Sequence, residues 1–438
     1  MDVETRLARL GVRVPDVLIP RSGVDLNRWA VVACDQFTSQ PEYWWEAAER
    51  VADQPSTLNL VFPEVYLHEP DPQARIESIN ATMAAYLADG VLDVQAHTMV
   101  LVRRRMNAGT VRWGLIVALD LEHYSWEPDA RPLIRATEGT ILDRLPPRVA
   151  IRRGAPLELP HIVVLISDAY RALIEPLAAA TDGLRCLYDT ELMLDGGEVT
   201  GWAIDSSEDV AAVASALERL RDELDPANPL LFAMGDGNHS FATAKSIWND
   251  LRETLSEAER DGHPARYCLV ELENIYDPGL EFEPIHRVLF HCARADFEAE
   301  LGRQCASFER LPAADLHDVL ASIENRDQQS FGYLDADGPA IYRLADPRAS
   351  LAAGTLQRTI DALLDRGDVE VDYIHGAQVT DELGRLPGNL GLLLPEVAKD
   401  TFFASVVADG ALPRKSFSLG SAEDKRYYLE ARRISGEN

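Results

Sequence analysis

The chain has 438 residues, of which 46% are hydrophobic and 26% charged, and its formal net charge is −30. These proportions indicate a soluble globular protein with room for two or three subdomains, and no apolar run approaches the length of a membrane span. Because so acidic a protein repels nucleic acid and anionic membranes, we expect neither as a partner. Five scattered cysteines without a C-x-x-C pair, and no evident signal peptide, favour a cytoplasmic protein. The oligomeric state stays open.

The first candidate element is the apolar run Trp29–Cys34, which predicts a buried strand. It leads directly into Asp35, with Thr38 and Ser39 close by. A strand that ends in such residues is a candidate edge of a site, with Asp35 as its acid. The alternative is structural, since Ser39 before Pro41 is also a typical helix start.

Helical and strand patterns then alternate along the chain. Residues 73–88 have the spacing of an amphipathic helix. Two hairpins are predicted, one from Thr98–Arg103 with Val111–Asp120, and one from the segments that flank Asp195–Gly197. We therefore expect a mixed α/β fold of the α+β kind.

The stretch 134–153 gathers arginines in an otherwise acidic chain. Arg135 and Arg144 are candidate phosphate ligands because the guanidinium fork suits phosphate oxygens. Glu138 is a candidate to hold a metal or to orient those arginines. The alternative is a surface network of ion pairs. Two consecutive prolines, Pro146–Pro147, predict an ordered loop here rather than a helix.

The central signal is the stretch 229–248. Leu230–Met234 is an apolar run of strand length, Gly235 and Gly237 interrupt it, and apolar residues then recur at helical spacing from Phe241. This pattern predicts a buried strand, a tight glycine turn and a helix N-terminus. Unpaired N–H groups and the helix dipole make such a turn a candidate anion site.

Four polar side chains stand at the mouth of this turn: Asp236, Asn238, His239 and Ser240. The alternative is an ordinary turn in which Asn238 or Ser240 caps the helix. Lys245, one of only four lysines in the chain, follows in the predicted helix. The stretch has neither a Walker A loop nor a full dinucleotide fingerprint, and the chain has no metalloprotease or serine-hydrolase motif.

The rest of the chain contains a neighbouring histidine and arginine and a pattern of alternating helices and strands. His286 and Arg287 follow Pro-Ile, and a lone histidine of this kind is more often structural than catalytic. A charged stretch from about 421 to 433 predicts a C-terminal helix. We expect two regions, 1–294 with the phosphate-binding turn and 295–438 packed on the same site.

Several of these segments together resemble the bacterial family called domain of unknown function 1015, and the resemblance covers essentially the whole chain. They are WAVVACDQFTSQPEYWW (29–45), IRATEGTILDRLPPRVAIRRGAPLELP (134–160), MGDGNHSFATAK (234–245), PIHRV (284–288), VDYIHG (371–376) and LPRKSFSLGSAEDKRYYLEARR (412–433).

The Asp236–Ser240 turn is also similar to the Asp-Gly-His-His-Arg turn of free serine kinases, which belong to the ParB/sulfiredoxin superfamily. The resemblance implies a ParB/sulfiredoxin-like core with large insertions and additional α/β subdomains. Here Asn238 stands in place of the first His and Ser240 in place of the Arg, so another cation must supply the missing charge. The candidates are Arg135, Arg144, Arg287 and Lys245.

The resulting hypothesis is a phosphotransferase that moves a phosphoryl group from ATP or ADP to a small hydroxylated metabolite, with free L-serine as the first candidate. The turn, Gly235 and Gly237 included, would hold the phosphate, and His239 would donate to it. Asp236 would bind Mg²⁺ or act as the base, and Asp35 or Glu138 would accept the hydroxyl proton. The alternatives are a nucleotide or phosphoester hydrolase and a regulatory protein that binds a nucleotide or metabolite without turnover.

Overall fold

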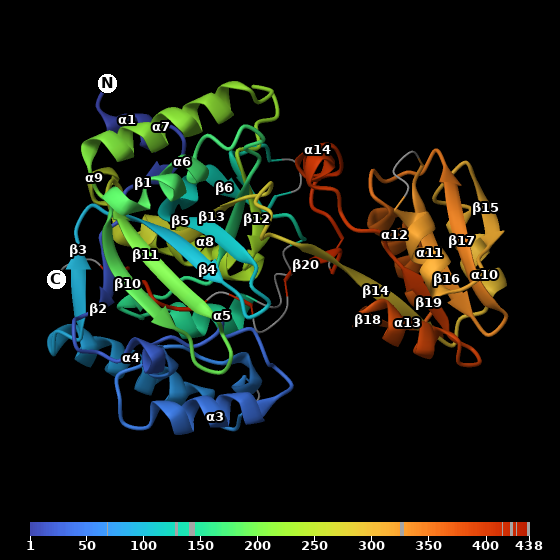
Figure 1. Ribbon diagram of the computed structural model, residues 1–438, viewed down its shortest axis with the longest axis horizontal. Coiled ribbons are helices and arrows are strands. Elements are labelled where there is room, and N and C mark those ends of the chain that lie inside the picture. The colour runs from blue at the N-terminus through green and yellow to red at the C-terminus, as the bar shows by residue number, and fades with distance from the viewer. Residues whose placement is uncertain are drawn as a thin grey trace. The chain divides into compact units, whose positions relative to one another are not determined.

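The computed structural model describes the chain except residues 68, 128–129, 140–144, 325–327, 414, 421–423, 426 and 436–438. It contains two compact units (Figure 1). The first consists of residues 1–136, 140–280 and 420–438, and the second of residues 137–139 and 281–419. The C-terminal segment therefore returns to the first unit, whereas the sequence-based division assigned it to the second region. The predicted mixed α/β class is confirmed.

A ten-stranded sheet forms the centre of the first unit, in the order β10-β11-β4-β5-β13-β9-β12-β7-β6, with β1 paired to β5. Both predicted hairpins are present in it as the antiparallel pairs β4–β5 and β10–β11. The strands are β1 (Val12–Arg13), β4 (Met99–Arg105), β5 (Val111–Asp120), β6 (Tyr124–Ser125), β7 (Ile134–Arg135), β9 (Val163–Ile166), β10 (Arg185–Glu191), β11 (Glu198–Ile204), β12 (Phe232–Asp236) and β13 (Tyr267–Asn274).

Both faces of this sheet are covered. One core packs against α1 (Val3–Ala8), α6 (Ile174–Ala179), α7 (Ser207–Asp222) and α8 (Asn238–Arg252). The other packs against α3 (Pro41–Val51), α4 (Pro72–Ala88) and the C-terminal segment. Met99 and Leu101 of β4 enter the first core, whereas Val100 and Val102 enter the second. A strand buried on both faces is apolar throughout, which explains the unbroken apolar runs of the sequence.

Shorter elements connect this framework. They are α2 (Leu26–Trp29), α5 (Leu145–Arg152), α9 (Glu257–Arg260) and the two-stranded pairs β2 (Val17–Pro20) with β3 (Leu92–Gln95) and β8 (Leu157–Glu158) with β21 (Arg432–Arg433). Among the residues that the structure describes, no helix is both long and apolar enough to cross a membrane.

Three local predictions were wrong. The run 29–34 forms no strand of a sheet; residues 29–33 lie buried, and the run makes a single bridge from Val32 to Tyr427. Pro146–Pro147 stand in the first turn of α5, where no N–H donor is needed, so the helix tolerates both. The described residues from 427 to 433 are extended rather than helical, because Tyr427 and its neighbours bury their side chains in the second core.

The second unit is built on a seven-stranded sheet, β15-β17-β16-β19-β14-β18, with β20 paired to β14. Helices α10 and α12 pack on one core and α11 and α13 on another. The strands are β14 (Phe282–Phe290), β15 (Ser307–Pro312), β16 (Ser330–Asp335), β17 (Gly338–Ala345), β18 (Glu370–His375), β19 (Leu390–Leu393) and β20 (Phe417–Leu419). The helices are α10 (Arg294–Leu301), α11 (Leu316–Ile323), α12 (Ala352–Leu364), α13 (Ala377–Gly384) and α14 (Lys399–Asp409).

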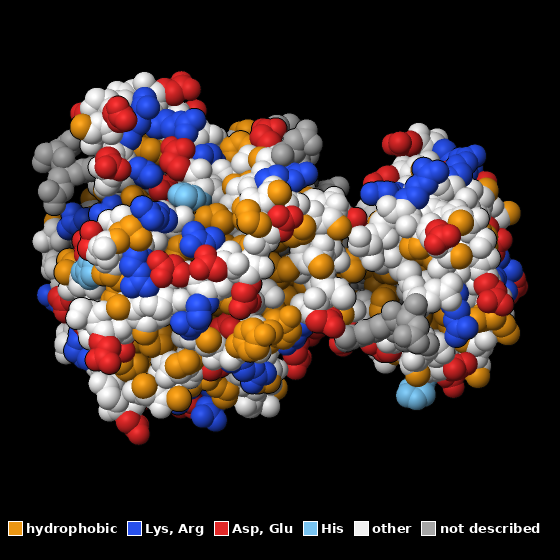
Figure 2. All heavy atoms as spheres, turned by 90° about the horizontal axis from the view of Figure 1, so that it is seen from above, with side chains coloured by type: hydrophobic (Ala, Val, Ile, Leu, Met, Phe, Trp, Pro, Cys, Tyr) orange, Lys and Arg blue, Asp and Glu red, His pale blue; other side chains and the backbone are white. Residues whose placement is uncertain are grey.

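On the face shown in Figure 2, acidic and basic side chains are interspersed. The net charge of −30 is therefore not gathered into one block on this face.

Candidate functional site

The predicted strand, glycine turn and helix start are confirmed as local structure. Strand β12 ends at Asp236, Gly237 forms the turn, and α8 begins at Asn238. Gly237 has φ 81°, a left-handed conformation that only glycine adopts at low cost. A Cβ atom at this position would lie 2.9 Å from Cγ1 of Ile162. Conformation and space therefore both require glycine here.

The start of α8 has the general properties of an anion site. The helix is 15 residues long, and the first N–H groups of any helix lack intrahelical acceptors. The helix dipole adds partial positive charge at this end. His239 lies half-buried in the first turn, and Asn238 is buried. Both residues therefore stand at the helix start, as the sequence predicts.

Lys425 from the C-terminal segment reaches this turn. Its Nζ lies 2.8 Å from Oδ2 of Asp236, and Oδ1 of Asp236 accepts a hydrogen bond from the Gly237 N–H at 2.8 Å. Burial by itself would raise the pKa of Asp236, but the charge and hydrogen bond of Lys425 hold it below its usual value. Burial would likewise lower the pKa of Lys425, and the Asp236 carboxylate raises it instead. Both groups are therefore charged at neutral pH.

Asp35 belongs to the same charged group. Its carboxylate also raises the pKa of Lys425, after burial and the larger effect of Asp236. Its side chain accepts a hydrogen bond from Gln36 Nε2 at 2.9 Å. Two sequence-predicted acids, Asp35 and Asp236, thus act on one ammonium.

A hydrogen-bonded chain that the sequence analysis missed lies beside the turn. Ser240 Oγ is 2.9 Å from His161 Nε2, and His161 Nδ1 is 3.2 Å from the Tyr428 hydroxyl, which accepts from the Cys34 N–H at 3.1 Å. Strands β9 and β12 are antiparallel, and Asp236 pairs with Val163, so the start of β9 meets the end of β12. A polar residue just before β9 was the signal that could have identified His161.

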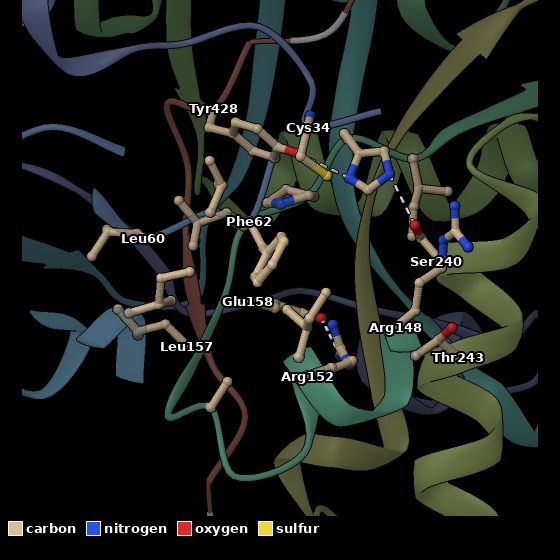
Figure 3. A pocket seen from close by; sticks show the side chains of 18 of the residues that line it. Cys34, Leu60, Phe62, Arg148, Arg152, Leu157, Glu158, Ser240, Thr243 and Tyr428 are labelled. Carbon is tan, nitrogen blue, oxygen red and sulfur yellow. Dashed lines mark hydrogen bonds and ion pairs between the residues drawn. The ribbon is translucent and has the colours of Figure 1, made fainter. Parts of the chain in front are cut away.

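A cavity of about 140 Å³ adjoins Ser240 (Figure 3). Glu64 and Arg148 form an ion pair in its wall. Burial raises the pKa of Glu64, and the Arg148 charge opposes that rise. The lining residues are Cys34, Leu60, Val61, Phe62, Glu64, Ile79, Met83, Arg148, Ile151, Arg152, Ala155, Leu157, Glu158, Leu159, Pro160, His161, Ile162, Ser240, Thr243, Cys268, Leu269 and Tyr428.

Two of the predicted phosphate ligands point elsewhere. Lys245 donates to the Leu121 carbonyl at 2.9 Å, about two turns along α8 from its start. The Arg135 guanidinium donates to the side chain of Asn228 and the carbonyl of Pro229, each at 2.6 Å. Pro229 precedes β12, so Arg135 is bound at the opposite end of that strand from Asp236. Neither cation replaces the missing arginine of the turn.

Glu138 and Arg287 belong to the second unit. Glu138 accepts a hydrogen bond from the Lys415 N–H at 3.2 Å. Burial lowers the pKa of Arg287 to about 10, and Tyr373 and Glu138 partly oppose that change. The structure therefore brings these two predicted residues near each other. Arg144 lies outside the described residues.

Within the described part of the chain, no three His, Cys, Asp or Glu side chains come together as a metal ligand set. A nucleotide-bound Mg²⁺ needs only one or two protein carboxylates, because phosphate oxygens and water complete its octahedron. The carboxylates of Asp236 and Asp35 fit that requirement.

Comparison with known proteins places the chain in a family. A family model described as "Protein of unknown function (DUF1015)" matches residues 18–363. The chain belongs to this family. The predicted membership is confirmed, and the match includes the turn, His161 and Asp35. No curated protein matches this DUF1015 chain.

Three solved structures are similar to this DUF1015 chain at low identity. A free serine kinase variant in complex with AMP is 7% identical, with a TM-score of 0.40 over 73% of this chain and 92% of that one. A conserved hypothetical protein from Pyrococcus furiosus is 9% identical, with a TM-score of 0.35 over 72% of this chain and 90% of that one. C-terminally truncated SbnI from Staphylococcus aureus is 10% identical (TM-score 0.35; 73% and 87%).

Proposed function

We propose that this protein is a phosphotransferase that moves a phosphoryl group from ATP or ADP to the hydroxyl of a small metabolite. One observation carries the proposal: Asp236 and the charge of Asp35 act on the half-buried Lys425 at a glycine turn that opens a helix. Phosphoryl transfer needs little covalent chemistry from a protein and depends on positioning and charge neutralisation. This turn offers both.

Lys425 supplies the positive charge that the turn lacks without an arginine. Free serine kinases carry an arginine where this chain has Ser240, and the ammonium of Lys425 lies at the same turn. On nucleotide binding, Lys425 exchanges part of its contact with Asp236 for a phosphate oxygen. His239 donates a hydrogen bond to the transferring group, and the dipole of α8 stabilises its charge.

Asp236 and Asp35 take the two remaining roles, those of metal ligand and base. Asp236, with the nucleotide phosphates, would hold Mg²⁺, which supplies charge neutralisation when bound. Asp35 accepts the proton of the acceptor hydroxyl. At the same time the hydroxyl oxygen forms the new bond to phosphorus, and the bond between phosphorus and the nucleotide oxygen breaks. The resemblance of the turn to that of free serine kinases makes L-serine the first acceptor to test.

The test is a mass-spectrometric search for a phosphorylated product. Purified protein is incubated with Mg²⁺, ATP or ADP and a pool of hydroxylated metabolites that includes L-serine. We expect one acceptor to gain a phosphate, and we expect His239→Ala and Lys425→Met to lower the rate at least a hundredfold, on the order of losing a transition-state donor. Lys245→Met is the matched control, because Lys245 lies off the turn and should leave the rate near that of the natural protein.

Two other outcomes decide against the proposal. Release of inorganic phosphate without any acceptor would identify a hydrolase. A nucleotide that raises the melting temperature without turnover would identify a regulatory binding protein.

A further inference from the structure

The cavity beside the turn has two chemically different ends. Leu60, Phe62 and Leu157 lie together on one side in Figure 3, and Phe62 is almost fully buried. Ser240 and Thr243 of α8 lie on the other side. A pocket that is mostly apolar, with a few converging polar groups at one end, is the usual form of a site for a small organic ligand.

The volume of the whole cavity limits the size of the ligand that it can hold. The cavity measures about 140 Å³. An engineered cavity of about 150 Å³ with apolar walls binds benzene. The space therefore suits an aromatic ring or a branched aliphatic group of about six carbons. The hydroxymethyl group of serine would leave most of it unfilled.

The polar end selects a neutral head group. The charges of Arg148 and Arg152 in the cavity wall are matched by Glu64 and Glu158 across ion pairs. The Thr243 hydroxyl already donates to the His239 carbonyl at 2.7 Å. Ser240 is held by His161, which Tyr428 holds in turn, so its hydroxyl has a fixed position at the cavity wall. A fixed hydroxyl without net charge is suited to another hydroxyl.

We propose that this cavity is the acceptor subsite and that the acceptor is an alcohol with an apolar group of about the size of benzene. The inference rests on the proposed phosphotransfer, which it deepens by naming the class of acceptor. The apolar group fills the space around Phe62, and the alcohol oxygen lies at Ser240, at the start of α8 where the phosphate is expected. Ser240 and His161 are positioning residues for this hydroxyl.

Binding is tested without turnover, by isothermal titration of the full-length protein. Benzyl alcohol and 3-methyl-1-butanol are the probes, and glycerol and L-serine are the polar comparisons. We expect the apolar alcohols to bind at least tenfold more tightly than glycerol. Ala155, which lines the cavity, is replaced in Ala155→Leu to fill it, and we expect this variant to lose at least tenfold in affinity for benzyl alcohol. Ala150→Leu is the matched control, because Ala150 is exposed on α5.

The outcomes separate this inference from the proposed function. Phosphotransfer to a polar acceptor that Ala155→Leu does not affect would overturn the subsite and leave the phosphotransferase standing. Tight alcohol binding that Ala155→Leu abolishes, without phosphotransfer to any alcohol, would keep the ligand class and overturn the proposed function. If adenosine displaces benzyl alcohol, the cavity belongs to the nucleotide base and the acceptor assignment is wrong. His161→Gln should raise KM for the alcohol more than it lowers kcat; an effect on kcat alone would overturn its positioning role.

Discussion

The ion pair between Lys425 and Asp236 makes a quantitative prediction about the first unit. At 2.8 Å the Coulomb attraction is about 6 kcal/mol at an effective dielectric constant near 20, before the cost of burial. Removing one partner of a buried pair typically costs roughly 3–5 kcal/mol. Because the Asp236 side chain is 29% exposed, we expect Lys425→Met to lower the free energy of unfolding by about 2–4 kcal/mol. Asp236→Asn should cost a similar amount, since it leaves the ammonium without its partner.

The double variant isolates the pair. Once both charges are gone, neither is left buried alone, so the double variant should lose about 2 kcal/mol less stability than the sum of the single losses. All seven tryptophans lie between residues 29 and 248, within the first unit, so their fluorescence in urea reports on that unit alone. The coupling should persist in 0.5 M salt, because a buried pair is weakly screened. A coupling below about 0.5 kcal/mol would refute the assignment of this ion pair.

Three further predictions concern single positions. Burial lowers the pKa of His286 to about 4, whereas the unfolded chain binds a proton at this residue near pH 6.5. The contribution of His286 to the stability of the second unit should therefore fall by roughly 3 kcal/mol from pH 6.5 to 4. Circular dichroism in urea should show that His286→Asn removes most of this dependence, and an unchanged slope would contradict it. Gly237→Ala should lower the free energy of unfolding by about 2–3 kcal/mol, because the new Cβ is both strained and crowded. Gly109 has a similar φ but open space around it, so Gly109→Ala should lower it by only about 1 kcal/mol. Equal losses of stability for the two variants in a fluorescence-monitored melt would exclude the crowding. Lys245→Met should lower stability by about 1–3 kcal/mol in urea, because the Leu121 carbonyl loses its donor, while nucleotide affinity in a titration stays unchanged; weaker binding would return Lys245 to the site.

The local structure of the turn could be predicted because its causes are local. Strand β12 is an apolar run, Gly237 adopts a positive φ that other residues avoid, and the helical spacing of α8 begins directly after it. The hairpins followed in the same way from turn residues between apolar segments. The predictions that failed concerned residues 29–34, 146–147 and 427–433, whose conformation depends on the segments that cover them. The extended C-terminal segment, for example, is held by side chains buried against the sheet.

The family, the mixed α/β class and the turn with Asp236, His239 and Ser240 could be inferred from the residues alone. Which groups meet that turn depends on the tertiary structure. Lys425 lies 189 residues from Asp236 and His161 lies 79 residues from Ser240, and no periodicity relates such positions. Lys245 was nearer in sequence but points to Leu121, because its place on the helix sets its direction. Spacing along the chain fixes local geometry, whereas the partners of a charged turn depend on which distant segments bury their apolar side chains against the same sheet.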